Sequence, residues 1–169
     1  MRGALVMIIK TNPNKEQRNI IRKAIADNDG YCCCKIEHNN DNRCMCKDFQ
    51  DQNQSGFCHC GLYYKLTDYP VVTLCGSTRF KDDFIRLQKE LTLAGYVVIS
   101  IGVFGHADHE AYSVGVKTML DDIHKQKIAM SDIVYIINRD GYIGESTQSE
   151  IEWAQELGKE IWYMEEKGE

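Results

Sequence analysis

The chain has 169 residues, 43% of them hydrophobic and 27% charged, with a formal net charge of −5 at pH 7. Such a composition is typical of a globular protein with one medium domain, or with a small domain joined to a medium one. The acidic balance argues against a broad basic surface for a nucleic-acid polymer, and no apolar stretch approaches the roughly 18 residues that a membrane-spanning helix needs.

The N-terminal part of the chain predicts one helix. The apolar run at residues 4–9 is shorter than the apolar region of a secretory signal, so we expect a cytoplasmic protein whose thiols stay reduced. Asn12 and Pro13 favour a helix start. Apolar residues follow at helical spacing between residues 20 and 25, and Gly30 closes the helix.

Residues 26–60 have a different composition. They are rich in Asn, Asp, Gln, Gly and Cys and poor in branched aliphatic residues. Such a segment buries little apolar area, so it needs another source of stability. The composition changes again near Lys65, and we predict two domains, a small Cys-rich helical module at 1–65 and a larger domain at 66–169.

The larger domain alternates apolar runs with amphipathic segments. Strands are predicted at 71–75, 96–104, 133–138 and 160–164, and helices at 80–94, 116–123 and 151–157. This alternation predicts an α/β domain, a Rossmann-like parallel sheet with helices on both faces.

Seven of the eight cysteines lie between residues 32 and 60, and six of them form three Cys-x-Cys pairs. A structural zinc site usually uses two C-x(2–4)-C pairs and leaves no cysteine spare. An iron–sulfur cluster takes four cysteines, which leaves two thiols to act as a redox couple. A structural zinc module and plain disulfides remain as alternatives.

The segments YCCCK, CMCKDF and GFCHCGLY resemble the catalytic subunit of ferredoxin:thioredoxin reductase over roughly residues 7–65. The resemblance implies a [4Fe-4S] cluster on four cysteines, Cys32, Cys44, Cys46 and Cys58. It also implies that Cys34 and Cys60 form the active disulfide and that His59 takes part in proton transfer. The implied partners are a ferredoxin-like electron donor and a thioredoxin-like or other thiol protein. Cys33 and Met45 stand where that family has proline.

Two segments of the larger domain predict a second site, at the carboxyl ends of its strands. The first is Gly76, Ser77, Thr78 and Arg79, where backbone N–H groups, hydroxyls and a guanidinium suit a phosphate. A capped helix start without a ligand is the alternative. The second segment, residues 144–150, has a glycine turn, two hydroxyls and a carboxylate, and comprises Gly144, Ser146, Thr147 and Glu150.

The motifs LCGSTRF, SDIVYIIN and ESTQSEIEWAQELGK resemble nucleoside 2-deoxyribosyltransferases and deoxynucleoside monophosphate N-glycosidases over about residues 70–164. The resemblance implies that Glu150 is the catalytic nucleophile, that a nucleoside or nucleotide is the substrate, and that a homo-oligomer is possible. Asp122 and His124 are candidates for the acid that protonates the leaving base. Three residues of the loop after the second strand are candidates for sugar or base contacts: His106, Asp108 and His109.

Glu150 as a solvated carboxylate at a helix start is the alternative to a catalytic role. Cys75, in an apolar strand, is expected to be a small core residue.

The sequence therefore predicts an iron–sulfur disulfide reductase module joined to a nucleoside N-glycosidase or deoxyribosyltransferase domain. One alternative is a nucleotide-binding or N-glycosidic-bond-cleaving protein with a structural zinc module and no redox activity. Another is a binding adaptor in which both sites have lost their chemistry.

Overall fold

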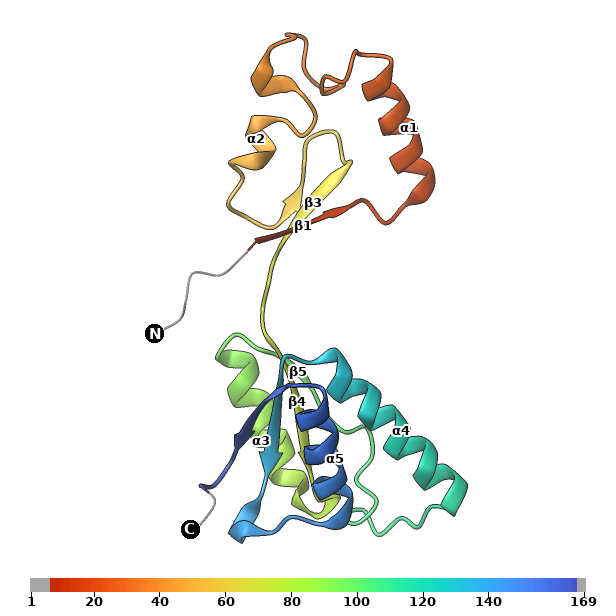
Figure 1. The fold of residues 1–169 in the computed structure, drawn as a ribbon, viewed down its shortest axis with the longest axis vertical. Helices are drawn as coiled ribbons and strands as arrows, with labels where there is room; N and C mark the ends of the chain where they lie inside the picture. The colour runs from red at the N-terminus through yellow and green to blue at the C-terminus, as the bar shows by residue number, and fades with distance from the viewer. Residues whose placement is uncertain (1–6, 167–169) are drawn as a thin grey trace. The chain divides into compact units, whose positions relative to one another are not determined.

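The structure is a computed structural model that describes residues 7–166. The chain divides into two units, Met1–Asp68 and Tyr69–Glu169 (Figure 1). The predicted boundary between residues 65 and 66 falls inside the last strand of the first unit, so that unit extends three residues further. Within residues 7–166, no helix combines the length and the apolar character needed to cross a membrane.

The first unit contains a small antiparallel sheet as well as helices. Its strands have the order β1-β3-β2, with Met7 of β1 opposite Thr67 of β3. The module that the sequence predicts as helical is therefore a mixed one. Its strands have only two to five residues each and give no long apolar run. The elements in chain order are β1 (Met7–Thr11), α1 (Lys15–Ala26), η1 (Asn40–Asn42), α2 (Lys47–Gln50), β2 (Gly56–Phe57) and β3 (Tyr63–Thr67).

The start of α1 is set by Asn14, whose side chain accepts a hydrogen bond from the Gln17 N–H at 3.0 Å. The predicted cap, Asn12, lies two residues earlier and is buried. Its side-chain amide donates to the Gly61 carbonyl at 2.8 Å. Asn12 thus joins the start of α1 to the turn between β2 and β3, which carries the third cysteine pair.

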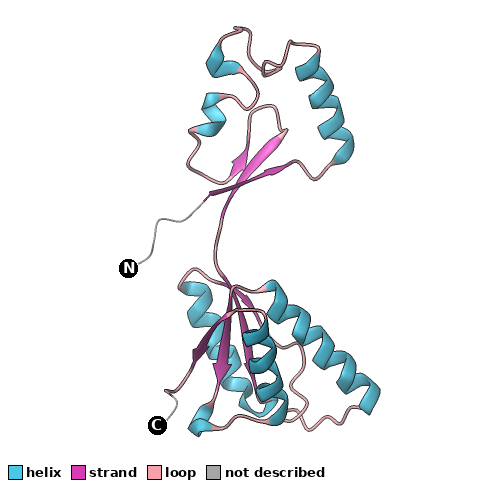
Figure 2. Ribbon diagram, in the orientation of Figure 1, coloured by secondary structure: helices cyan, strands magenta, loops and turns pink. Residues whose placement is uncertain are grey.

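The second unit is a four-stranded parallel sheet flanked by helices, as predicted (Figure 2). The strands have the order β5-β4-β6-β7. Their bounds are β4 (Val71–Gly76), β5 (Val97–Ile99), β6 (Ile133–Ile137) and β7 (Glu160–Tyr163). The helices are η2 (Thr78–Phe80), α3 (Lys81–Leu93), α4 (Val114–Met130), η3 (Arg139–Gly141) and α5 (Glu145–Glu156).

Alternate residues of β4 face opposite sides of the sheet. Leu74 packs into a core with Phe84 of α3, whereas Cys75 packs into a second core with Ile128 of α4 and Ile151 of α5. Figure 1 shows α3 on one side of the strands and α4 and α5 on the other. The helices therefore cover both faces of the sheet, and Cys75 points to the α4/α5 side.

The strand order changes direction at β4, because the chain passes first to β5 on one side and then to β6 on the other. Ligand sites in open α/β sheets lie beyond the carboxyl ends of the strands at such a point. Gly76 ends β4 there, and a Cβ at this position would lie 2.9 Å from both the Cβ and the carbonyl oxygen of Ile137. The close approach of β4 and β6 at this end requires glycine.

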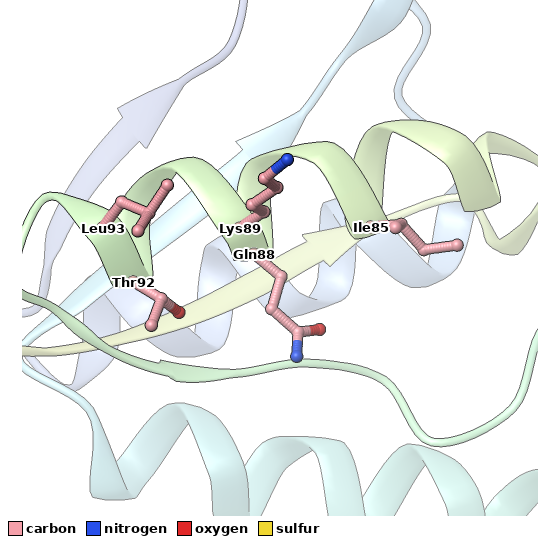
Figure 3. Close-up of a pocket in the computed structure, with 5 residues that line it drawn as sticks. All are labelled: Ile85, Gln88, Lys89, Thr92 and Leu93. Atoms are coloured by element: carbon pink, nitrogen blue, oxygen red, sulfur yellow. The ribbon is translucent and has the colours of Figure 1, made fainter.

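One surface hollow of the second unit does not lie at this end of the sheet. It has a volume of about 390 Å³ and is lined by five residues of α3: Ile85, Gln88, Lys89, Thr92 and Leu93 (Figure 3). Lys89 is the one charged side chain in it, and the lining comes from a single helix. Converging polar groups mark ligand sites, and this hollow has none.

Candidate functional site

The first candidate site is a core built from cysteines. The three Cys-x-Cys pairs pack together with apolar side chains of α1 and α2, among them Ile21, Ile25 and Phe49. One sulfur of each pair is buried, and the other members are partly buried. The buried cysteines are Cys32, Cys46 and Cys58, and the partly buried ones are Cys34, Cys44 and Cys60. Cys33 is exposed, so its thiol stands outside this core.

Short turns position each pair. Cys32 and Cys34 follow α1, Cys46 is the residue before α2, and Cys58 and Cys60 occupy the turn between β2 and β3. Two backbone hydrogen bonds join the first two segments, from the Cys32 N–H to the Asn42 carbonyl at 2.8 Å and from the Cys44 N–H to the Gly30 carbonyl at 3.1 Å. The turns thus bring residues up to 28 positions apart into one core.

The sulfurs of two pairs are in contact within the pair. The Cys32 and Cys34 sulfurs are 3.0 Å apart, and the Cys58 and Cys60 sulfurs are 3.5 Å apart. All eight cysteines, each of which lies in the described part of the chain, are free thiols. The disulfide between Cys34 and Cys60 that the resemblance implies thus stays a prediction. His59 is exposed at the tip of its turn.

Burial opposes ionisation of these thiols. It raises the pKa of Cys34 to about 12 and that of Cys44 to about 11, and a negative charge on Cys32 adds to both shifts. At Cys32 burial acts in the same direction, but hydrogen bonds from neighbouring thiols outweigh it and lower the pKa. One thiolate in this core therefore disfavours the next, and several thiolates together need a bound cation to offset their charge.

The cysteine sulfurs do not form a ready-made site for a single zinc ion. Four sulfurs at 2.3 Å from one zinc ion lie about 3.8 Å apart. Among the described residues, no three cysteine sulfurs all lie within 4.8 Å of one another. A cluster with an iron atom at each of four corners holds its thiolates further apart than one zinc ion does. In addition, the Tyr63 N–H donates to the Cys58 sulfur at 3.2 Å, a contact that tunes cluster potentials.

The second candidate site lies on the α4/α5 side of the larger sheet. The Cys75 sulfur lies 3.2 Å from Nε2 of His124, and that nitrogen lies 3.7 Å from Oε1 of Glu150. The three residues come from β4, α4 and α5. His124 and Glu150 are among the predicted site residues. Cys75 is buried in the core, as predicted, but its contact with His124 was not predicted. The signal that could have found Cys75 is its position directly before the GSTR segment at the end of a strand.

Burial dominates the electrostatics of this group. It raises the pKa of Glu150 to about 8, where a hydrogen bond from Cys75 acts in the opposite direction and Asp121 adds to the rise. Burial also lowers the pKa of His124 to about 4, and the positive charge of Lys127 contributes. At neutral pH the site thus holds a neutral imidazole and a largely protonated carboxyl. Oε2 of Glu150 is buried, and no hydrogen-bond partner from residues 7–166 reaches it.

A cavity of about 100 Å³ adjoins Glu150 and is lined by polar side chains of α4 and α5. The lining residues are Asp121, Lys125, Ser146, Ser149 and Glu150. Asp121 and the predicted acid Asp122 are both exposed, but only Asp121 lines this cavity. Thr147, in the first turn of α5, is buried, and Gly144 directly precedes that helix.

The predicted phosphate segment joins two loops at the same end of the sheet. Nη2 of Arg79 donates to the Tyr142 hydroxyl at 3.2 Å, and its guanidinium lies 4.2 Å from the centre of the Tyr142 ring. Nε of Arg79 donates to the Ser77 hydroxyl at 3.1 Å. The Thr78 hydroxyl lies 2.8 Å from Nδ1 of His106. The loops after β4, β5 and β6 therefore meet, and Arg79 already has partners within the chain.

Two further residues of the loop after β5, Asp108 and His109, were predicted to contact a sugar or base. Neither belongs to the Cys75–His124–Glu150 group. Asp108 pairs with Lys81 at 2.6 Å, and His109 is exposed with a positive φ of 56°.

In comparisons with known proteins, no family model matches the chain, and no curated protein matches it at a significant level.

Proposed function

We propose that the first unit is an iron–sulfur disulfide reductase. Its four predicted ligands are Cys32, Cys44, Cys46 and Cys58, and its dithiol is Cys34 with Cys60. The observation that carries this proposal is the packing of all three Cys-x-Cys pairs into one core, with two sulfurs beyond the four that a cluster uses. The six cysteines of the three pairs are also more than the four ligands that one zinc ion takes.

The chain's own thiols carry the bond exchange. A thiolate of the Cys34/Cys60 pair attacks the disulfide of a thiol protein, forms a mixed disulfide with one target sulfur and releases the other. The second thiol of the pair then attacks the mixed disulfide. The target leaves with two thiols, and Cys34 and Cys60 are joined. His59, exposed between Cys58 and Cys60, can return protons to the sulfurs that leave.

Two electrons restore the dithiol, and a ferredoxin-like donor delivers them one at a time. The cluster supplies the one-electron chemistry of this step when it is bound. Partial burial of Cys34 and Cys60 keeps them beside the ligand cysteines while leaving them open to a partner protein. A reducing cytoplasm is the compartment in which we expect this cycle.

Purification without oxygen tests the first proposal. We expect brown protein with a broad absorbance band near roughly 400 nm, containing iron and acid-labile sulfide. Cys58→Ser should lose the colour, whereas Cys33→Ser, a matched control at an exposed thiol, should keep it. A colourless protein with one zinc ion per chain would contradict the proposal and support a structural zinc module.

We infer a second function for the larger unit, the cleavage or transfer of an N-glycosidic bond in a nucleoside or nucleotide. The observation that favours it is a buried carboxyl, Glu150, beside a polar cavity at the carboxyl end of the sheet. Ser146 and Ser149 line the same cavity and offer hydroxyls to a sugar.

In this proposal the fraction of Glu150 that has released its proton to solvent attacks the anomeric carbon. The C–N bond breaks, an ester bond to Glu150 forms, and the base leaves with a proton. Asp121 faces the cavity and is the group we assign to this protonation. His124, a neutral imidazole in contact with Glu150, holds the carboxylate in place. Water, or a second base, then takes the sugar from Glu150.

Release of free base from a panel of nucleosides and their 5′-monophosphates tests the second proposal. Glu150→Ala should abolish release, and Glu152→Ala, an exposed carboxylate two residues further along α5, should leave it unchanged. Equal activity of the wild type and Glu150→Ala would exclude Glu150 as the nucleophile. The larger unit would then be a nucleotide-binding domain only.

A further inference from the structure

The Cys75–His124–Glu150 group has the geometry of metal ligands as well as of a catalytic site. One ligand atom from each residue, a sulfur, a nitrogen and an oxygen, lies within 4.8 Å of the other two. The three residues belong to β4, α4 and α5, which pack through a shared apolar core. The site is therefore held by three separate elements of the fold.

The distances match those around a tetrahedral zinc ion. With bonds of about 2.3 Å to sulfur, 2.0–2.1 Å to nitrogen and 2.0–2.2 Å to oxygen, such an ion sets sulfur and nitrogen about 3.6 Å apart, and nitrogen and oxygen about 3.4 Å apart. The corresponding distances here are 3.2 Å between Cys75 and His124 and 3.7 Å between His124 and Glu150. These two distances differ from the zinc values by about 0.3–0.4 Å, and the third pair, Cys75 and Glu150, lies within 4.8 Å.

The polar groups of this site are also incompletely satisfied by the chain. Oε2 of Glu150 is buried, without a hydrogen-bond partner among the described residues. Burying such an oxygen costs free energy unless something binds it. Thiolate, imidazole and carboxylate together suit zinc, whereas magnesium and calcium prefer oxygen ligands alone.

We propose that Cys75, His124 and Glu150 bind a zinc ion, with the fourth position open to the cavity beside Glu150. That cavity, about 100 Å³ in volume, has room for a water molecule, whose share of liquid volume is about 30 Å³. Binding releases the proton of the Cys75 thiol and any proton held by Glu150. Three protein ligands and one open position are the arrangement of zinc sites that exchange their fourth ligand.

Zinc binding has a regulatory consequence that rests on the proposed glycosidic activity. An oxygen of Glu150 that coordinates zinc is not free to attack an anomeric carbon. Zinc-bound and glycosidase-active forms of the larger unit would then exclude each other. The binding claim itself does not depend on any activity of Glu150.

A cobalt titration of the full-length protein tests the site without substrate. Co²⁺ replaces zinc in tetrahedral sites and reports thiolate ligation through its visible spectrum. The wild type and Cys75→Ser are compared after anaerobic purification, with Cys33→Ser as a matched control at an exposed thiol. Metal bound by the first unit is common to all three proteins and cancels in the difference.

We expect the wild type and Cys33→Ser to bind one more tetrahedral Co²⁺ per chain than Cys75→Ser, and Zn²⁺ to displace it. The affinity of the site should fall by at least about 10–100-fold in Cys75→Ser, the range known even for loss of an outer-shell partner. If Cys75→Ser does not fold, as judged by circular dichroism, Glu150→Gln takes its place. Equal stoichiometry and affinity in the wild type and the folded variant would overturn the proposal.

The two proposals for Glu150 can fail separately. Metal binding lost in Cys75→Ser, combined with base release that ignores Glu150→Ala, leaves the zinc site and removes the glycosidase. Base release that depends on Glu150, combined with no Cys75-dependent metal, removes the zinc site alone.

Discussion

Replacing Glu150 by glutamine should make the larger unit more stable at alkaline pH. Burial raises the pKa of Glu150 from 4.5 to about 8 in the folded protein. A carboxyl with a raised folded pKa stabilises the protein fully only below its unfolded pKa, and that contribution is lost as the pH rises toward the folded pKa. The window for Glu150 is therefore pH 4.5 to about 8. Glutamine does not titrate, so the Glu150→Gln variant does not lose stability in this pH window.

The magnitude follows from the same values. A tenfold change in proton affinity corresponds to about 1.4 kcal/mol, so the interval from pH 5 to pH 8 gives at most about 4 kcal/mol. The Glu150 side chain is only 15% exposed, which limits screening, but the adjoining cavity admits water. We therefore expect the stability difference between Glu150→Gln and the wild type to grow by about 2–4 kcal/mol between pH 5 and pH 9.

Tryptophan fluorescence during urea unfolding measures this difference in the larger unit alone, because both tryptophans of the chain, Trp153 and Trp162, belong to it. A chelator keeps the protein free of metal. Glu152→Gln, at an exposed position of the same helix, is the control and should follow the wild type at both pH values. A Glu150→Gln difference that is the same at pH 5 and pH 9 would refute the argument from burial.

Three further substitutions test the supports of the two sites. Lys65→Met removes a buried ammonium that donates to the carbonyls of residues 50 and 52 at 2.7 and 2.6 Å. Each carbonyl left without a hydrogen bond costs about 1–3 kcal/mol, so amide hydrogen exchange in residues 47–52 should accelerate. Gly76→Ala places a Cβ 2.9 Å from Ile137 and should destabilise the larger unit by about 1–3 kcal/mol. An unfolding curve, followed by tryptophan fluorescence, that matches the wild type would contradict this prediction. The Arg139 guanidinium lowers the pKa of the buried Asp83 carboxyl. The ionised Asp83 therefore stabilises the folded larger unit at pH values above the unfolded pKa of about 3.8, and this stabilisation is lost as the pH falls below that value. Asp83→Asn should remove that acid-dependent loss, and a wild-type-like acid profile in the variant would contradict the assignment.

Much of the larger unit could be predicted from apolar periodicity, because strands covered on both faces are continuously apolar. The strand predicted at 71–75 is observed as Val71–Gly76, and that predicted at 133–138 as Ile133–Ile137. The strand predicted at 96–104 was overextended, since Val97–Ile99 is an edge strand that pairs with β4 over three residues only. Helix α5 begins six residues before the predicted 151, at Glu145, because its first turns are polar and carry no apolar period.

The rest depended on contacts that no local pattern contains. The pairing of β1 with β3 joins residues up to 60 positions apart, and each of these strands has only five residues. Likewise, the position of Cys75 against His124 follows from how α4 crosses the face of β4. The sequence could identify the cysteine pairs, because their ligand spacing is local, but it could not say which side of the sheet Cys75 would face.

The pairing of Met7 with Thr67 places the start of β1 beside the end of β3. The cysteine segment thus leaves from and returns to neighbouring points of one small sheet, before the chain enters β4. Segments whose ends lie close together can be grafted or excised with little effect on their host. The first unit is therefore suited to insertion into a surface loop of another protein, because its two ends would join neighbouring residues of that loop.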